Sequence, residues 1–150
     1  MTNEWTKGPS LNGERADHSC FYDRKSNSVY VAGGRKMKEY PFEKLLNTAE
    51  KWKLDSNAWK KIGSLPTFRG TGIFLAAAVP SNSKKFIGFF AGGYTGYGLR
   101  NKVYGLRRKD EKWIDMPKRL LYGGRASHSM VNLAADEKPF TSYCAFPSWE

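Results

Sequence analysis

The side chains best suited to acid–base catalysis are the two histidines, His18 and His128. A serine follows each one, Ser19 and Ser129, and a serine beside a histidine is the pairing that activates a hydroxyl nucleophile. Neighbouring residues of a β-strand point to opposite faces, so neither histidine can readily reach the serine next to it. The two histidines also hold the same place in a repeated motif, which favours a structural role. We therefore predict that the protein is not an enzyme and has no catalytic residues.

Metal and cofactor sites are not indicated either. The chain has two cysteines, Cys20 and Cys144, with no Cys-x-x-Cys pair and no spacing typical of metal ligands. Asp23, Asp55 and Asp110 fall between apolar segments, where turn geometry favours aspartate. A glycosidase would need two carboxylates about 5–10 Å apart across a pocket, and no spacing singles out such a pair. Both cysteines stand in apolar or aromatic surroundings, so we expect buried free thiols, and we expect no metal ligands and no cofactor.

The composition is that of a folded, β-rich domain with a basic surface. Hydrophobic residues make up 40% of the 150 residues, aromatic residues make up 15%, and 15 glycines and seven prolines supply turns. Lys and Arg number 25 against 14 Asp and Glu, a net charge of +11, which suits nucleic acid, anionic membrane or acidic protein partners. No apolar run approaches a membrane span or the core of a signal peptide, so we expect no membrane association and favour a cytoplasmic location.

A motif recurs along the chain with a period near 54 residues. Tryptophans stand at positions 5, 59 and 113, spaced by 54 and 54 residues, and arginines at 15, 69 and 125, spaced by 54 and 56. The sequence from Arg15 to His18 recurs from Arg125 to His128, and the middle copy has Gly72 at the histidine position. Two glycine pairs and three prolines hold fixed places in the same order: Gly33-Gly34, Gly92-Gly93, Pro9, Pro66 and Pro117. Such a period predicts stacked copies of one structural unit.

Each period contains four apolar segments of strand length, bounded by turn residues. The second segment of each unit is apolar at consecutive positions, which is typical of a strand buried on both faces. The eight segments are 18–22, 28–32, 49–54 and 58–62 in the first unit, then 72–79, 86–91, 102–106 and 112–116 in the second. The apolar residues from Phe42 to Trp52 are also spaced as on one face of a helix. The second half of this segment matches a predicted strand of the second unit, so the repeat allows a short helical turn only over 42–46.

The pattern resembles the kelch repeat, a four-stranded β-propeller blade of about 50 residues. In that family an Arg and a His open the first strand, a glycine pair closes the second, an aromatic residue lies in the third, and a Trp and then a Pro mark the fourth. Matching residues in the first unit are Arg15, His18, Gly33, Gly34, Trp52, Trp59 and Pro66. The second unit matches at Arg69, Gly92, Gly93, Trp113 and Pro117, with Leu106 in place of Trp52, and the third at Arg125 and His128.

The resemblance implies an all-β fold of kelch-type blades, an incomplete propeller of about two to three four-stranded blades. Residues 1–13 would be the last strand of a preceding blade, 14–66 kelch repeat 1, 67–118 kelch repeat 2, and 119–150 the start of a divergent or truncated kelch repeat 3. We expect a fragment of a longer propeller. Self-association through the exposed flanks of the end blades is one alternative, because repeat units bury their faces only by stacking. A stable partial arc or a degenerate gene product is the other.

The glycine pairs have a structural explanation in this scheme. They close the inner part of each blade, where glycine permits positive φ and close backbone approach. The competing interpretation is a phosphate-binding loop, since Gly92-Gly93 begins the glycine-rich stretch "GGYTGYG". Such a loop needs a helix after it, and the segment that follows is typical of a strand.

Blade geometry divides the basic residues between the two ends of the molecule, which disfavours a nucleic-acid footprint. One end would hold Arg35, Lys36, Lys38, Lys44, Arg100, Lys118 and Arg119, and the other Arg24, Lys25, Lys84, Lys85, Arg107, Arg108 and Lys109. A solvated basic surface is the first interpretation of this charge, an acidic protein partner is the second and nucleic acid is the third.

The resemblance implies a protein–protein interaction module, such as the substrate-recognition part of a ubiquitin-ligase adaptor. The alternative is part of a kelch-propeller enzyme, of the sugar oxidase or sialic-acid isomerase type. We predict partner contacts in the loops around 35–40 and 94–100, because Tyr and Arg are enriched at binding hot spots and loops on rigid scaffolds commonly carry function. The predicted contact residues are Arg35, Lys36, Lys38, Tyr40, Tyr94, Tyr97 and Arg100.

Overall fold

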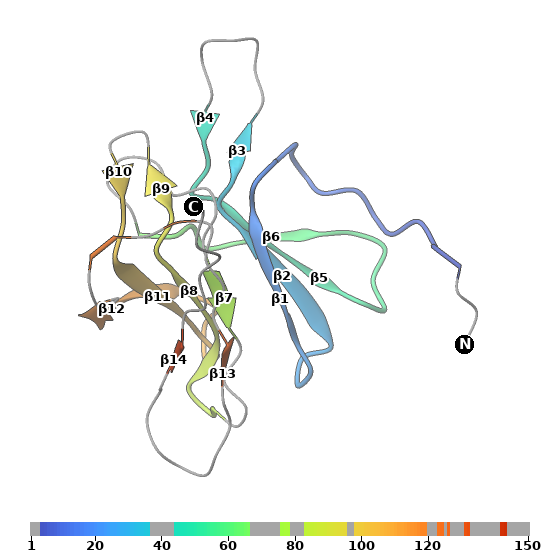
Figure 1. The fold of residues 1–150 in the computed structure, drawn as a ribbon. Helices are drawn as coiled ribbons and strands as arrows, with labels where there is room; N and C mark the ends of the chain where they lie inside the picture. Colours follow the sequence, from blue (N-terminus) through green and yellow to red (C-terminus); the bar gives the residue numbers. More distant parts are fainter. Residues whose placement is uncertain are drawn as a thin grey trace.

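The computed structural model describes residues 4–36, 44–66, 76–78, 83–95, 98–119, 123–124, 126, 131–132 and 142–143. Over these residues the fold is all-β, as the sequence predicted, and all paired strands run antiparallel (Figure 1). Two four-stranded sheets form most of the described structure, and three two-stranded ribbons accompany them.

The first sheet is a meander in chain order, β1-β2-β5-β6. Its tight turns are closed by polar side chains. Asp23 Oδ2 accepts hydrogen bonds from the Ser26 backbone NH (3.2 Å) and hydroxyl (2.7 Å), and Asn27 adopts a φ of 47°. Such local bonds are why Asp, Ser and Asn favour turns. The strands lie at four of the predicted segments: β1 (Ser19–Asp23), β2 (Ser28–Ala32), β5 (Ala49–Lys53) and β6 (Lys60–Ile62).

The second sheet repeats this arrangement with the order β12-β11-β8-β7. Its strands are β7 (Ala76–Ala78), β8 (Phe86–Ala91), β11 (Lys102–Arg107) and β12 (Trp113–Arg119). The turn between β11 and β12 places Glu111 at a φ of 51°, and the Arg107 NH donates to Lys112 O (2.9 Å). The remaining predicted segments are thus strands too, although only 76–78 of the segment 72–79 lies in the described residues.

A short ribbon joins the second and third strands of each sheet, and the sequence did not predict either one. The first ribbon is β3 (Arg35–Lys36) with β4 (Lys44–Leu45), and the second is β9 (Tyr94–Thr95) with β10 (Gly98–Leu99). Where the sequence allows a helical turn over 42–46, Lys44–Leu45 is a strand. A third ribbon pairs β13 (Val131–Asn132) with β14 (Ser142–Tyr143).

Both glycine pairs adopt the same left-handed conformation between a sheet and its ribbon. The φ angles are 70° and 90° at Gly33 and Gly34, and 72° and 95° at Gly92 and Gly93. A side chain on Gly34 would lie 2.5 Å from Ala16 O and 3.1 Å from the Cβ of His18. Glycine is therefore required here for backbone conformation and for close approach. After the second pair come strands β9 and β10, which is the context of a sheet and not of a phosphate-binding helix.

Hydrogen bonds around the glycine pairs show which positions of the two sheets correspond. In the first sheet Gly33 NH donates to Thr48 O (3.1 Å), and in the second Gly92 NH donates to Lys102 O (2.9 Å). Likewise Leu46 NH donates to Gly34 O (2.8 Å) in the first sheet, and Arg100 NH donates to Gly93 O (2.8 Å) in the second. Residues 46–62 therefore match residues 100–116. Residues 29–34 match 88–93, and through strand pairing 19–21 match 76–78.

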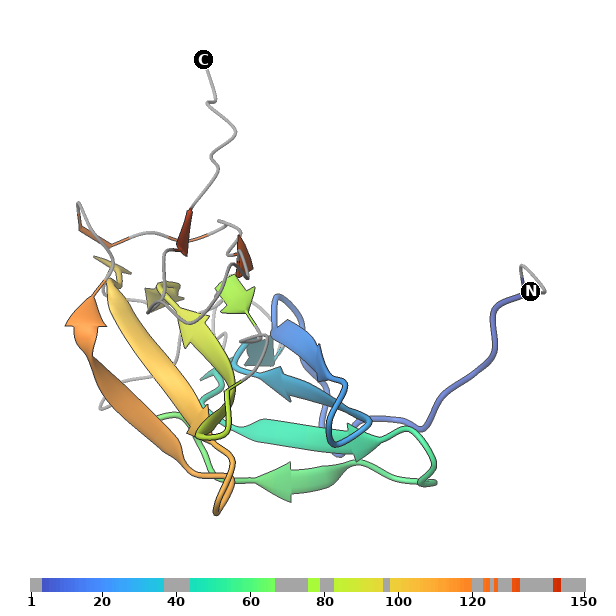
Figure 2. The ribbon, with the colours of Figure 1, turned by 90° about the horizontal axis from the view of Figure 1, so that it is seen from below.

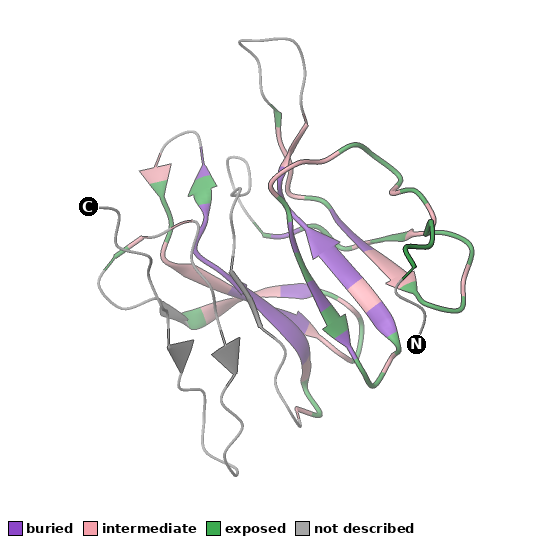
Figure 3. Ribbon diagram, turned by 45° about the vertical axis from the view of Figure 1, so that its right-hand side comes forward, coloured by how far each residue is buried: buried purple, intermediate pink, exposed green. Residues whose placement is uncertain are grey.

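The core lies between the two sheets, which form separate layers (Figure 2). Phe21 of the first sheet stacks on Tyr30 with ring centroids 5.2 Å apart, and it meets Phe90 of the second sheet at 5.3 Å. Phe90 in turn contacts Trp113 at 5.1 Å. Buried positions follow the central strands of both sheets (Figure 3). Aromatic packing across this layer accounts for the high aromatic content of the chain.

Polar contacts also join the two sheets at the end that carries the β1–β2 and β11–β12 turns. Arg108 donates from Nη1 and Nη2 to the two carboxylate oxygens of Asp23 at 3.0 and 3.2 Å. Lys51 Nζ donates to Glu111 Oε1 at 2.6 Å, and the Tyr30 hydroxyl donates to the same oxygen at 3.4 Å. Burial raises the pKa of Asp23, but hydrogen bonds from Arg108 and Ser26 outweigh it, so the pKa is lowered overall.

Candidate functional site

The two ribbons that follow the glycine pairs project from the same end of the molecule (Figure 1). We call this end the ribbon edge, and define it by its described residues Arg35, Lys36, Lys44, Leu45, Tyr94, Thr95, Gly98, Leu99 and Arg100. Both ribbons begin at a left-handed glycine pair, so the same backbone geometry places both of them. Three of the predicted contact residues, Lys38, Tyr40 and Tyr97, lie outside the described residues. The other four all belong to the ribbon edge.

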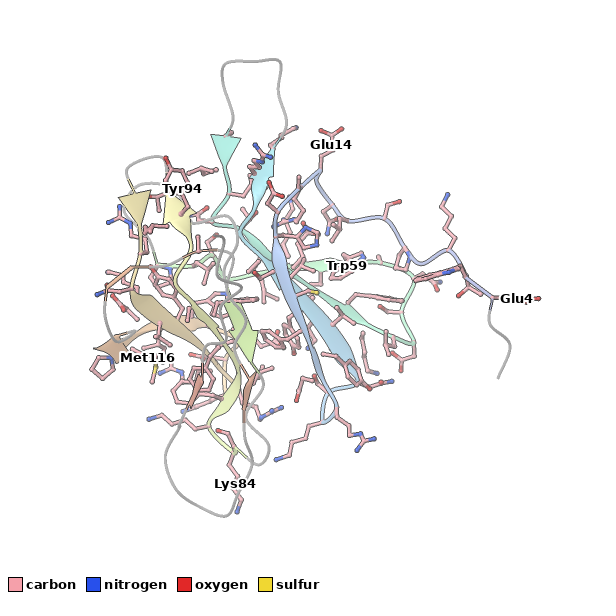
Figure 4. The ribbon with its side chains drawn as sticks, viewed as in Figure 1. Glu4, Glu14, Trp59, Lys84, Tyr94 and Met116 are labelled. Carbon is pink, nitrogen blue, oxygen red and sulfur yellow. The ribbon has the colours of Figure 1, made fainter. Side chains whose placement is uncertain are left out.

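An exposed apolar pair stands on the second ribbon. Tyr94 and Leu99 are directly opposite each other across β9 and β10, and they are 40% and 56% exposed. Directly paired positions of an antiparallel ribbon share a face, so the two side chains form one apolar surface. Figure 4 labels Tyr94 at this end of the molecule. The sequence indicated Tyr94 as a contact residue but not Leu99, because only the pairing of β9 with β10 shows that Leu99 lies opposite Tyr94.

Arg100 is held at the base of the same ribbon by local hydrogen bonds. Its backbone NH donates to Gly93 O (2.8 Å), and its guanidinium Nε donates to Thr95 Oγ1 (3.2 Å). Thr95 is buried, at 3% exposure, and so supplies a fixed acceptor. The Arg100 residue itself is exposed. Thr95 follows Tyr94 in β9, so Arg100 is held on the face of the ribbon opposite the Tyr94–Leu99 pair.

The first ribbon adds further cations to the ribbon edge. Arg35 donates from Nε to Asp17 Oδ2, and its backbone pairs with Ala16 through two hydrogen bonds of 2.9 Å. Lys44 is exposed and Lys36 is half-buried. Across the part of the chain that the structure describes, Lys36, Lys44 and Arg100 take part in no ion pair. Their charges are thus available to an incoming anion.

The opposite end of the molecule is basic as well, and part of its charge is paired. Arg107 bonds to Asp110, Arg108 to Asp23 and Lys51 to Glu111. The Arg107 hydrogen bonds lower the pKa of Asp110 to about 2. None of the large exposed hydrophobic side chains found among the described residues belongs to the turns Asp23–Ser28 or Arg107–Lys112. Arg24, Lys25, Lys84, Lys85 and Lys109 take part in no ion pair among the described residues, and Leu54 in the β5–β6 turn is 42% exposed. What distinguishes the ribbon edge is the direct pairing of two exposed apolar side chains on one ribbon.

The repeated arginine holds the backbone around the first glycine pair. Arg15 donates from Nη1 to Gly33 O (3.0 Å) and Thr48 O (3.1 Å), and from Nη2 to Glu50 Oε1 (2.6 Å). Glu50 Oε2 accepts from the backbone NH (2.9 Å) and amide (2.8 Å) of Asn12. Arg15 and Glu50 have side chains only 2% exposed. Burial raises the pKa of Glu50, but the bonds from Asn12 and Arg15 outweigh it and lower the pKa overall.

The other described residues of the repeat motif lie in structural surroundings too. His18 is beside Gly34, and its pKa is lowered because neighbouring atoms desolvate the imidazole and the Arg15 charge is close. Trp59 donates its indole NH to Pro9 O (3.0 Å), while Trp113 is 8% exposed in the core. Ser19 is the first residue of β1 and is buried, whereas His18 precedes the strand and is exposed. Cys20, which the sequence predicts to be buried, is exposed as well. Arg69, Arg125 and His128 lie outside the described residues.

Metal-binding clusters and membrane-spanning helices are both absent from the described residues. No group of three or more His, Cys, Asp and Glu side chains within them could hold a metal ion. No helix within them is long and apolar enough to cross a membrane.

No protein-family model matches the chain, and no curated protein sequence matches it.

Proposed function

We propose that this chain is a protein–protein interaction module built from kelch-type propeller blades, and that the ribbon edge is its contact surface. The observation that carries the proposal is the exposed Tyr94–Leu99 pair on an edge that also carries the exposed cations Lys44 and Arg100. The partner is an acidic protein segment with at least one apolar side chain.

The two sheets support the assignment to propeller blades. Each is a four-stranded antiparallel meander, each carries a glycine pair of the same conformation after its second strand, and the sheets stack face on face. Stacked four-stranded meanders with a repeated motif are the architecture of a propeller. Of the boundaries proposed from the sequence, 14–66 contains β1 to β6, and 67–118 contains β7 to β12 except Arg119, the last residue of β12. Residues 4–13 form no strand here. A strand in this segment would have to pair with a neighbouring strand of a preceding blade, so its place in such a blade stays a prediction.

The chemistry of the ribbon edge supports a protein partner. Tyr and Arg are the side chains that most often dominate binding energy at interfaces, and they do so when a polar rim excludes water around them. Tyr94 and Leu99 supply the apolar contact, and Arg100, Lys36 and Lys44 supply the rim. Exposed cations attract an acidic partner and accelerate its association. The role of a ubiquitin-ligase substrate receptor remains a prediction from the resemblance.

The proposal is tested by selecting ligands from a displayed library of random peptides. The library is selected on the immobilised chain, and the binding of enriched peptides is measured by fluorescence anisotropy. We expect enriched sequences to combine Asp or Glu with an aromatic or aliphatic anchor. Binding should weaken as salt rises. Tyr94→Ala and Arg100→Ala should each lower affinity by about 30-fold, corresponding to a hot-spot loss of about 2 kcal/mol.

Lys85→Ala at the opposite end is the matched control, because it also removes an exposed cation. It should leave affinity unchanged within about twofold, because salt screens an exposed charge that lies far from the contact surface. Enriched peptides without acidic residues would contradict the partner chemistry. Equal losses in Lys85→Ala and Arg100→Ala would contradict the ribbon edge as the contact surface.

A further inference from the structure

Hydrogen bonds from one arginine hold three loops together at the end of the molecule opposite the ribbon edge. The Arg108 backbone NH donates to Lys85 O at 2.8 Å, and its guanidinium donates to both carboxylate oxygens of Asp23. The β1–β2 turn, the loop before β8 and the β11–β12 turn are therefore neighbours, although they come from two sheets. We call these loops the basic end, and define it by residues 23–28, 83–86 and 107–112.

The acids of the basic end are already paired. Each has its own cation, in the pairs Asp23–Arg108, Asp110–Arg107 and Glu111–Lys51. Hydrogen bonds from Arg107 and the nearby charge of Lys112 lower the pKa of Asp110 to about 2, so Lys112 also has an acid close by. Five further cations are exposed and take part in no ion pair among the described residues: Arg24, Lys25, Lys84, Lys85 and Lys109.

This pairing changes what the charge of the chain indicates. The sequence ranks nucleic acid third among the interpretations, because it divides the cations between two ends of the molecule. That division counts every cation, whether or not an acid neutralises it. In the structure the unpaired cations of the basic end stand on three adjoining loops, and Figure 4 labels one of them, Lys84, at the end opposite Tyr94.

The loops of the basic end offer no exposed apolar anchor of their own. None of the large exposed hydrophobic side chains found among the described residues belongs to them. The nearest two are Tyr22, on the face of β1 turned away from its neighbour Asp23, and Leu54, in the β5–β6 turn. Protein interfaces depend on apolar and aromatic anchors, whereas binding to a nucleic-acid backbone depends on cations that neutralise phosphates. The basic end therefore matches a row of phosphates better than a protein surface.

A duplex fits these loops better than a single strand does. A double helix carries one negative charge per about 1.7 Å of its axis, so closely spaced cations can each meet a phosphate. Single strands gain affinity when their bases stack on exposed aromatic rings. The one aromatic residue of the basic end is Phe86, which is half-buried and has Lys85 Nζ over its ring, 5.5 Å from the centroid.

We propose that the basic end binds the phosphate backbone of a nucleic-acid duplex without reading its base sequence. The first sheet contributes Arg24 and Lys25, and the second sheet contributes Lys84, Lys85 and Lys109. Because Arg108 joins the three loops, these cations keep their places relative to one another. The proposal goes beyond the proposed function and does not involve the ribbon edge.

The salt dependence of binding is the first test. The probe is a short, fluorescently labelled DNA duplex of mixed sequence, and fluorescence anisotropy gives its association constant at several salt concentrations. Five phosphate contacts predict that log K falls against log salt with a slope of about −4.5, a loss of about 500-fold for a fourfold rise in salt. A duplex of unrelated sequence should bind equally well. No binding at low salt, or a slope shallower than about −2, would overturn the proposal.

Two double variants test whether both sheets contribute. Arg24→Ala with Lys25→Ala removes two cations of the first sheet, and Lys84→Ala with Lys109→Ala removes two of the second. Each should reduce the size of the slope by about 2, because each lost phosphate contact changes it by about 0.9. All four side chains are exposed, and circular dichroism verifies that the variants are folded. A change in only one of the two variants would overturn a surface shared by the three loops.

The matched control is Lys44→Ala with Arg100→Ala, which removes the same charge from the ribbon edge. It should leave the slope unchanged, and an equal reduction would show binding spread over the whole basic surface and overturn the proposal. The rival partners are tested with a DNA single strand of the same length, polyglutamate, and vesicles that contain phosphatidylserine. Tighter binding to any of these than to the duplex at the same salt concentration would overturn the assignment.

Discussion

The contact between Phe21 and Gly88 is where the two sheets approach most closely at a side chain, and replacing Gly88 by alanine tests it directly. An added Cβ would lie 2.7 and 2.8 Å from the Cε2 and Cε1 atoms of the Phe21 ring. The left-handed glycines do not include Gly88, so the substitution introduces no backbone strain of that kind. The ring cannot retreat easily, because Tyr30 stacks on it at 5.2 Å and Phe90 meets it at 5.3 Å.

The expected cost follows from this overpacking. Extra methyl groups in a well-packed core destabilise a protein by about 1–3 kcal/mol. Urea unfolding followed by circular dichroism should show the free energy of unfolding of Gly88→Ala lowered by that amount. The slope against urea should be unchanged, because the buried surface is nearly the same.

A double-mutant cycle identifies the cause of the loss. Phe21→Leu removes the ring edge that the new Cβ meets, so Gly88→Ala should cost less by about 1 kcal/mol or more in that background. Gly13→Ala is the control, since no atom lies within 4 Å of a Cβ there, and it should change stability by less than about 0.5 kcal/mol. Strict additivity of Phe21→Leu and Gly88→Ala, or a Gly88→Ala variant as stable as Gly13→Ala, would refute the described packing.

Three further predictions concern the buried ion pairs and the glycine pairs. Glu50→Gln leaves the 2% exposed Arg15 side chain without its anionic partner and should cost about 3–5 kcal/mol at pH 7. The pKa of Glu50 is lowered in the folded state, so its contribution to stability is complete above the unfolded pKa of about 4 and is lost as pH falls below it. Urea titrations at pH 7 and pH 3 should therefore differ more for the unmodified chain than for Glu50→Gln, and equal pH dependence would count against the pairing. Arg108→Ala removes the partner that lowers the pKa of the 3% exposed Asp23 side chain and should shift acid unfolding, followed by tryptophan fluorescence, to higher pH, with an unchanged midpoint as the contrary result. At Gly34 the φ is 90° and an added Cβ would lie 2.5 Å from Ala16 O, whereas at Gly98 the φ is 123° and an added Cβ would meet open space. Thermal unfolding should therefore show that Gly34→Ala lowers the free energy of unfolding more than Gly98→Ala does, by more than about 1 kcal/mol. Equal losses of stability would contradict the role of close approach.

The repeat period was a reliable guide to the strands, because each unit must present the same buried positions to its neighbours. The segments 28–32 and 86–91, apolar at consecutive positions, are β2 and β8 at those same bounds. Both are central strands, covered on each edge by a partner. Glycine pairs after these strands predicted positive φ, and all four glycines have it.

The ribbons could not be predicted from the same pattern. Strands β3, β4, β9 and β10 have two residues each, too few for any alternation of apolar and polar residues to be recognised. Their pairing places Leu99 opposite Tyr94, and this neighbour relation depends on the turn between them. The sequence therefore indicated Tyr94 and Arg100 as candidates and missed Leu99.

The amino-acid sequence by itself determined the repeated unit, the strands and the conformation of the glycine pairs, because these depend on local spacing and on the backbone freedom of single residues. Only the tertiary structure decided which side chains meet: Phe21 over Gly88, Arg108 on Asp23, and Asn12 with Arg15 on Glu50. These partners are between 35 and 85 residues apart in the chain, with Arg15 35 residues from Glu50 and Arg108 85 residues from Asp23. Contacts of that kind depend on the stacking of one sheet on the next, which no local pattern of residues encodes.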